Sequence, residues 1–482
     1  MTRSSPALAI DHAPTLDALF AEPAQEAAYA IAEIEGALPK WRRGAYYVNG
    51  PASFGLGEVR YQHWLDGDGM VAALRFEDGT THFASRFVGT RKRTDETREG
   101  RALYRAFGTR FEGDRLRRNL MLEPPVNVAV QPFAGTLLAL GEQSLPLELD
   151  PVTLETRGEF DFGGALNEVS PFAAHAKIDP TSGHLFNFGV AYAADRTTLT
   201  LYEFDKHGRR VSRRRQPLDA PYTIHDFALA PRFAVFHAGP YLMHVERLLA
   251  GGTLLDALEF DARRPSELLL VPRTKGAEPK RIRVDEGYCL HMINAFEEAE
   301  TLVVDLILYE RPLYAEYHPL PNLFADVSKG RVVRYAVNLE TGEATNATLA
   351  GYDAAPDFPS IDPELVGKAY DQFWCLGISA AGAPGRKFFD QLVRMSSSGD
   401  DVDCFTLPQG EHFGGEPAYV AGPTPEEAVV IVEVFRPEAV GGRCGFALFR
   451  AHDLAAGPVV EIPLSTKILP GFHSSFAKEV RQ

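Results

Sequence analysis

The chain has few cysteines, no long apolar run and no excess of positive charge. None of its four cysteines forms a CxxC pair, which argues against a disulfide framework or a cysteine zinc site. No stretch approaches the roughly 18 consecutive apolar residues of a membrane-spanning helix, and the first residues lack the apolar core of a signal peptide. We therefore expect a protein of the reducing cytoplasm.

The net charge and the absence of two sequence motifs argue against further classes of protein. Lys and Arg number 49 against 65 Asp and Glu, and the net charge of −16 argues against a nucleic-acid partner. Basic runs at 91–98 and 209–215 are interpreted as solvated turns. There is no GxGxxG fingerprint followed by an acidic residue and no P-loop, so no organic redox cofactor or nucleotide is expected. Nothing implies a protein partner.

The 482 residues are dominated by short strand-like runs separated by Gly, Pro and Asp turns, which is typical of antiparallel meanders. Residues 1–35 are interpreted as an Ala-rich arm with a short helix around Gln25–Ile34. Residues 36–482 are expected to form one all-β domain. Two helical interruptions are expected, at 245–260 and at 363–374.

The apolar segment 240–258 has two interpretations. Its residues have helical spacing with a Gly-Gly break, so it could dip into a membrane surface. It could equally be a lid packed on the core. The membrane interpretation gains weight if the substrate is a lipid.

Four histidines lie in short frames of small, apolar and aromatic residues. The frames are AAHAKIDP, YTIHDFAL, CLHMINAFEE and PGFHSSF, and their histidines are His175, His225, His291 and His473. Taken singly, each is better explained as a satisfied core histidine. A site using all four would need a closed, circular fold, and four neutral imidazoles suit a divalent transition metal.

Histidine ligands need a partner that accepts the other ring N–H. The candidates are Glu142 in LALGEQSLPLELD, Asp357 in PDFPSID and Glu416 in FGGEPAYV. All three lie in apolar, aromatic or Gly/Pro-rich surroundings, where an unpaired carboxylate is costly. Singly, each could also be a loop carboxylate or a turn cap.

From about Gly36 to Phe476 the chain resembles the carotenoid cleavage oxygenases. The resemblance rests on successive motifs in the family's order, including EGALPKWRRGAYYVNGP, QHWLDGDGMV, AHAKIDP with HLFNFG, IHDFAL, HMINAFEE, GEPAYV and LPGFH. In the first motif Val48 stands where the family usually has Arg.

The resemblance implies a seven-bladed β-propeller with a loop and helix cap over an axial Fe(II) ion. It implies that His175, His225, His291 and His473 bind the iron. By the same carry-over Glu142 supports His225, Glu416 supports His473 and Asp357 supports His291, whereas His175 has no carboxylate partner. The family usually has Glu at position 357, so the shorter Asp is expected to need a water bridge or a small backbone shift.

The implied reaction is cleavage of a conjugated carbon–carbon double bond by O₂, giving two carbonyl compounds without a general acid or base. Val128 stands where many relatives have Thr beside the metal. The retinoid isomerohydrolase branch also has an apolar residue there, which keeps an isomerase interpretation open. A non-catalytic propeller that binds no iron is the third alternative.

The substrate is expected to be an apolar polyene, a carotenoid or apocarotenoid. Stilbene-cleaving relatives bind a phenol hydroxyl through a Lys and a Tyr, and those positions here hold Gly141 and Phe107. Stilbene cleavage remains the alternative. The residues expected to line the substrate tunnel, with ordinary core packing as the alternative, are Leu65, Phe107, Val128 and Phe296.

Overall fold

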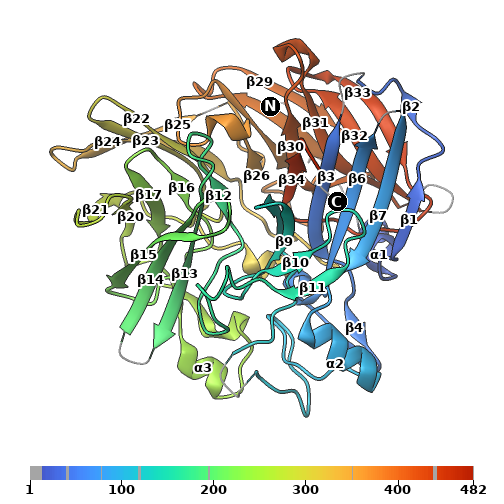
Figure 1. Cartoon of the computed structure of the whole chain (residues 1–482), viewed down its shortest axis with the longest axis horizontal. Coiled ribbons are helices and arrows are strands. Elements are labelled where there is room, and N and C mark those ends of the chain that lie inside the picture. The colour runs from blue at the N-terminus through green and yellow to red at the C-terminus, as the bar shows by residue number, and fades with distance from the viewer. Residues whose placement is uncertain are drawn as a thin grey trace, which may run out of the picture.

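The computed structural model describes residues 13–39, 43–77, 79–117, 121–193, 196–349, 351–437 and 442–480. Within these residues the strands form seven antiparallel sheets of four or five strands, arranged as blades around a central axis (Figure 1). This arrangement confirms the all-β class and the seven-bladed propeller that the sequence predicts.

The blades follow one another along the chain. The first blade contains β1 Ala27–Ala30, β3 Gly44–Pro51, β6 Gly69–Glu77, β7 Thr80–Phe87 and β34 Ser474–Ala477. The seventh blade contains β2 Glu35–Gly36, β30 His412–Val420, β31 Val429–Arg436, β32 Arg443–Arg450 and β33 Asp453–Pro463. The second blade contains β8 Ala129–Phe133, β9 Thr136–Leu140, β10 Leu147–Leu149 and β11 Thr156–Glu159. The third blade contains β12 Lys177–Ile178, β13 Leu185–Ala193, β14 Arg196–Phe204 and β15 Arg210–Leu218. The fourth blade contains β16 Ala228–Leu229, β17 Phe233–Ala238, β20 Ser266–Pro272 and β21 Lys280–Val284. The fifth blade contains β22 Met292–Glu298, β23 Thr301–Leu308, β24 Arg331–Asn338 and β25 Ala344–Leu349. The sixth blade contains β26 Asp357–Ser360, β27 Gln372–Gly377, β28 Gln391–Ser396 and β29 Val402–Thr406.

The remaining elements are short. Two small hairpins pair β4 Gly55–Leu56 with β5 Val59–Arg60 and β18 Tyr241–Met243 with β19 Leu258–Phe260. The α-helices are α1 Ala13–Phe20, α2 Arg91–Glu99 and α3 Val245–Leu249. Single 3₁₀ turns occupy Trp64–Asp66, Leu255–Ala257, Tyr314–Tyr317, Pro363–Leu365 and Pro425–Glu427. No helix in the described part of the chain is long and apolar enough to cross a membrane.

The middle strands of the blades are buried on both faces because each sheet packs between two others. In β31 seven consecutive residues from Val429 are buried, and in β23 the same holds for the seven residues from Leu302. Apart from one buried acidic residue in each, Glu433 in β31 and Asp305 in β23, these strands are apolar runs rather than alternating ones, as expected for strands covered on both sides. The sequence runs therefore report burial between blades.

The two ends of the chain close the ring. The C-terminal strand β34 pairs with β3 in the first blade, and β2 near the N-terminus pairs with β33 in the seventh. Figure 1 shows the blue strands of the first blade beside the red strands of the last. This exchange carries the segment that contains His473 back to the axis.

Two local expectations were wrong. The Ala-rich stretch around Gln25–Ile34 is not a helix, because β1 within it pairs along β7 at the edge of the first blade, and the helix of the arm lies earlier, at α1. The segment 363–374 is a single 3₁₀ turn followed by the start of β27. For residues 27–30 and 372–374, hydrogen bonding to a sheet outweighs local helix propensity.

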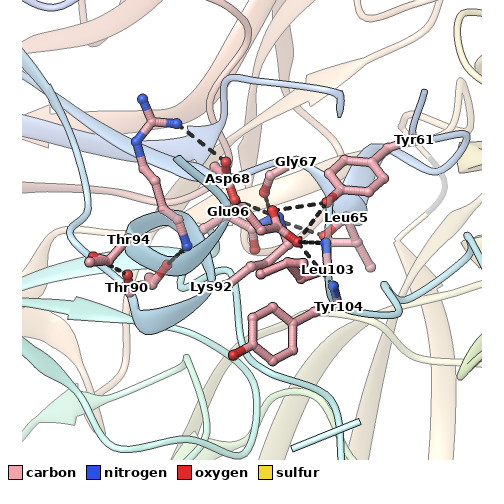
Figure 2. A network of polar contacts seen from close by, with 12 residues as sticks. Tyr61, Leu65, Gly67, Asp68, Thr90, Lys92, Thr94, Glu96, Leu103 and Tyr104 are labelled. Carbon is pink, nitrogen blue, oxygen red and sulfur yellow. Dashed lines mark hydrogen bonds and ion pairs between the residues drawn. The ribbon is translucent and has the colours of Figure 1, made fainter. Parts of the chain in front are cut away.

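A buried charge network fixes α2 against the first blade (Figure 2). The Lys92 ammonium, 1% exposed, contacts Asp68 at 2.7 Å and Glu96 at 3.0 Å. Glu96 also accepts hydrogen bonds from the main-chain amides of Leu103 and Tyr104. Both carboxylates that contact the Lys92 ammonium are themselves paired inside the protein. Through Glu96 the network also holds the segment that follows α2 in place.

Glu433 is a buried carboxylate at the seam between the first and last blades. Its side chain accepts a hydrogen bond from the Gly471 amide at 2.7 Å, and no Lys or Arg contacts it in the described ranges. Glu433 and Val48 line a cavity of about 10 Å³, room for one water. Val48 is apolar, so the residue that shares this cavity with Glu433 offers the carboxylate no cation. Burial raises the pKa of Glu433 to about 8.

This raised pKa predicts a pH-dependent stability. The folded state holds the Glu433 proton up to about pH 8, whereas the unfolded chain releases it near the ordinary value of 4.5. The free energy of unfolding should therefore fall as the pH rises between these values, at up to about 1.4 kcal/mol per unit. In urea unfolding Glu433→Gln should flatten this slope, whereas Glu267→Gln, at a partly exposed carboxylate paired with Arg281, should not. An unchanged slope in Glu433→Gln would contradict the assignment.

Candidate metal centre

The four histidines occupy equivalent places in four blades. Each lies one to three residues before the first strand of its blade or, for His473, before the closing strand β34. Three of these strands contact strands of neighbouring blades: β16 contacts β22, β22 contacts β26, and β34 contacts β8 and β30. Side chains at the starts of the strands therefore converge from distant parts of the sequence.

The imidazoles form one cluster. The candidate ligand atoms of His175, His225, His291 and His473 all lie within 4.8 Å of one another. The Nε2 atoms of His175 and His225 are 2.9 Å apart. The Nε2 atom of His291 is buried and has no hydrogen-bond partner. A buried, unpaired ring nitrogen facing three other imidazoles fits a bound cation, because it would otherwise be a costly unsatisfied group.

Three carboxylates contact histidines of the cluster at their Nδ1 atoms. Glu416 lies 2.7 Å from Nδ1 of His473, Glu142 lies 2.9 Å from Nδ1 of His225, and Asp357 lies 2.5 Å from Nδ1 of His291. Each contact occupies Nδ1 and leaves Nε2 as the ring nitrogen available to a metal. Acceptors at Nδ1 are the usual devices that fix the tautomer of a metal-binding histidine.

Asp357 reaches His291 directly, without a bridging group. It is the first residue of β26, and the pairing of β26 with β27 is irregular between Asp357 and Ser360. The next residue, Phe358, has a positive φ of 53° and its amide donates to the Asp357 carboxylate. The Asp357 carboxylate therefore contacts His291 directly, at a point where the strand pairing is irregular.

Burial and charge set the protonation of the ring nitrogens. Burial, with the neighbouring His473, holds the pKa of His175 well below its usual range, and burial also lowers the pKa of His473. For His291 burial acts in the same direction, but the Asp357 carboxylate outweighs it and the pKa is raised. At neutral pH His175 and His473 are uncharged donors, the form that binds a metal.

Accessible surface remains at the centre. The Glu142 side chain keeps 34% of its surface exposed and the His225 side chain 13%, although both lie inside the ring of blades. Such surface requires open space beside these two residues. This is the side from which a substrate could approach.

The four expected tunnel residues divide into two groups. Phe107 packs against the ring of Tyr314 at 5.4 Å, and the Tyr314 ring lies 6.4 Å from that of His225. The Val128 carbonyl accepts a hydrogen bond from the amide of His473 at 3.1 Å. These two therefore lie beside the cluster.

The other two are less directly placed. Leu65 is half-buried, and its carbonyl accepts a hydrogen bond from the side chain of Asn127, the residue directly before Val128. Phe296 lies in the core of β22, where its ring packs against Tyr370 and the Arg334 guanidinium. For Phe296 the alternative of ordinary core packing fits the structure.

Sequence reasoning missed two residues beside the cluster. Asp226 has Oδ1 3.6 Å from Nδ1 of His175, although it follows His225 directly. Tyr314 lies in a 3₁₀ turn between the fifth blade's strands, and no spacing pattern marks it. The available sequence signal for Asp226 is that an acidic residue directly follows His225 in the IHDF frame.

Comparison with known proteins agrees with this geometry. The family described as Retinal pigment epithelial membrane protein matches residues 20–478. An apocarotenoid-15,15'-oxygenase of Synechocystis sp. is 29% identical over 94% of both chains. A lignostilbene-alpha,beta-dioxygenase, isozyme III, of Sphingomonas paucimobilis is 31% identical over 92% of this chain and 93% of the relative.

Solved structures show the same fold. The crystal structure of cobalt-substituted Synechocystis ACO matches with a TM-score of 0.88 and 27% identity, covering 96% of this chain and 98% of that chain. Sequence and structure thus agree over nearly the whole length. The chain belongs to the retinal pigment epithelial membrane protein family of carotenoid oxygenases, whose relatives include apocarotenoid-cleaving and stilbene-cleaving dioxygenases.

Proposed function

We propose that the protein is a non-haem Fe(II)-dependent dioxygenase that cleaves a conjugated double bond of a carotenoid or apocarotenoid. The observation that carries the proposal is the cluster of four histidines, three of them in contact with a carboxylate. The apocarotenoid-15,15'-oxygenase relative supports the substrate class. The reaction consumes one O₂ and one alkene and yields two carbonyl products, so atoms and electrons balance without a further reductant.

His175, His225, His291 and His473 would hold the iron through the ring nitrogens directed into the cluster. A transition metal suits this all-nitrogen set better than Mg²⁺ or Ca²⁺, which prefer oxygen ligands. Iron, when bound, supplies O₂ activation beside an electron-rich double bond. Glu142, Asp357 and Glu416 keep the ring nitrogens in the tautomer needed for binding.

The surrounding side chains position the substrate and exclude water. Phe107 and Tyr314 form an aromatic wall next to His225 and suit the flat face of a conjugated chain. Val128, whose main-chain carbonyl contacts the His473 amide, has an apolar side chain and so adds no hydroxyl at this position. No side chain has to transfer a proton, since O₂ addition and bond cleavage release none.

The test is product analysis. The purified protein is loaded anaerobically with Fe(II), mixed in air with a long-chain apocarotenal, and its products are read by mass spectrometry. Two shorter carbonyl fragments are expected, and their masses identify the cleaved bond. Intact apocarotenal beside fully bound iron would overturn the proposal. Release of an isomerised alcohol from a retinyl ester would then favour the isomerohydrolase alternative.

Stilbene or phenylpropenoid cleavage is the second candidate, favoured by a cluster of tyrosines. Tyr241, Tyr288 and Tyr314 pack together with ring centroids 5.6 to 6.3 Å apart. Burial raises the pKa of both the Tyr288 and the Tyr314 phenol, so both hydroxyls stay protonated at neutral pH. These hydroxyls could receive a substrate oxygen near the metal, in place of the Lys and Tyr that this chain lacks. The lignostilbene dioxygenase relative is consistent with this candidate.

Under this candidate Tyr314→Phe should lower kcat/KM for 4-hydroxystilbene about 5–10-fold, the value of one hydrogen bond, and leave that for unsubstituted stilbene unchanged. The ratio of the two rates is the measurement. Tyr47→Phe, which removes a phenol that donates to the Pro151 carbonyl in another part of the fold, is the control. An equal loss for both stilbenes would show that the Tyr314 hydroxyl contributes nothing specific.

We also propose peripheral membrane contact through residues 240–258. Leu249 is 49% exposed at the end of α3, which supports contact. The lid interpretation has support as well, because the Arg105 guanidinium donates hydrogen bonds to the carbonyls of Leu248 and Gly252 and so holds this segment against the rest of the protein. Co-flotation with liposomes is the expected result, reduced by Leu249→Ser. A protein that stays with the unbound fraction would leave the lid as the function of this segment.

A further inference from the structure

We infer that Asp226 is a positioning residue that holds three of the four histidine segments in place. The inference rests on the proposed metal centre and concerns a residue outside its three carboxylate partners. Asp226 is nearly inaccessible, with 2% of its side chain exposed. It lies between the segments that carry His175, His225 and His291.

Each oxygen of the Asp226 carboxylate contacts a ligand segment. Oδ1 accepts from the amide of Phe227, in its own segment, at 2.7 Å and contacts the Lys177 ammonium at 3.0 Å. Oδ2 accepts from the amide of Met292 at 2.9 Å. Lys177 is two residues after His175, and Met292 directly follows His291. A single carboxylate thereby joins the starts of β12, β16 and β22, the first strands of three successive blades.

Asp226 also differs from the other three carboxylates in its relation to a histidine. Glu142, Asp357 and Glu416 each lie within 2.5 to 2.9 Å of an Nδ1 atom. The Asp226–His175 distance of 3.6 Å is too long for a hydrogen bond. Asp226 therefore acts on His175 through its negative charge and through Lys177. This explains how His175, the one histidine of the four without a carboxylate within 3 Å of its Nδ1 atom, keeps its place.

The contacts predict a specific result for Asp226→Asn. The substitution keeps the shape but removes the charge that balances Lys177 and one of the charge-assisted acceptors. The Kd for Co²⁺ should rise about 10–100-fold, as for other residues that orient metal ligands. The visible absorption of bound Co²⁺, which reports coordination geometry, should change as well. Thermal unfolding of the metal-free protein measures the structural cost separately.

Two further variants separate positioning from general stability. Asp305→Asn breaks another pair between a buried aspartate and a partly exposed cation, with Arg334 at 2.7 Å, in the fifth blade. It should lower the unfolding temperature but leave the Co²⁺ Kd and spectrum unchanged. The double variant Asp226→Asn/Lys177→Met removes the ammonium that the single variant leaves unpaired. Its Co²⁺ affinity should stay low if the carboxylate itself positions the ligands.

Four outcomes would overturn the inference. The first is a wild-type Kd and spectrum in folded Asp226→Asn, and the second is an equal loss of affinity in Asp305→Asn. The third is full recovery in the double variant, which would assign the effect to the unpaired Lys177. The fourth is failure of both Asp226 variants to fold with or without metal, which would make Asp226 a general folding residue. Failure of the wild-type protein to bind Co²⁺ or Fe²⁺ would instead reject the proposed metal centre.

Discussion

Replacing His225 with alanine is expected to abolish both iron binding and cleavage activity. The ring nitrogen that is lost lies 2.9 Å from that of His175, so its removal opens one side of the cluster. It also leaves Glu142 without its imidazole partner. Bound iron, measured after gel filtration, should fall from stoichiometric to background, and His473→Ala should behave in the same way.

A buried histidine outside the cluster gives the matched control. His237 lies on β17 in the same blade as β16, is 5% exposed and has a pKa lowered to about 4 by burial. His237→Ala should cost stability through lost packing but should leave iron content and product yield at wild-type levels. Full iron in His225→Ala, or an equal loss in His237→Ala, would refute the assignment of the cluster as a metal centre.

Changing Asp357 is expected to have the second-largest effect. Asp357→Asn removes the negative charge that raises the pKa of His291, and the iron affinity should fall about 10–100-fold. Asp357→Glu should also lower the affinity, by less. The carboxylate is only 2% exposed and already touches the imidazole, so one more methylene has to displace its surroundings.

Direct titration of apoprotein with Fe(II) under anaerobic conditions measures these affinities. Glu142→Gln provides a comparison at a partly exposed carboxylate, where the same 10–100-fold loss is expected. In contrast, Glu142→Asp should be tolerated better than Asp357→Glu, because the open space around Glu142 accommodates a changed length. A gain in affinity for Asp357→Glu would instead mean that the shorter carboxylate is a defect that this protein tolerates.

The sequence alone supported the class of fold and the set of histidines. Strand-length apolar runs between turn residues, such as those at β14, β23 and β31, report burial from local composition, and the structure has strands there. The four histidine frames and three carboxylate frames are also local patterns. The structure brings all four histidines together and places each carboxylate at the expected imidazole.

Tertiary structure alone decided the features that depend on residues distant in the chain. Gln25–Ile34 has helical composition, but an open sheet edge at β7 makes part of it a strand. Direct contact between Asp357 and His291 depends on an irregular strand pairing that no residue pattern encodes.

The contacts of Asp226 and Tyr314 follow the same rule. Asp226 meets Lys177 and Met292 because three blades converge at the axis. Tyr314 reaches His225 from a turn far later in the chain. Local sequence determines which side chains lie at the start of a strand. Closure of the ring determines which of them touch, because only closure brings the strand starts of different blades to one axis.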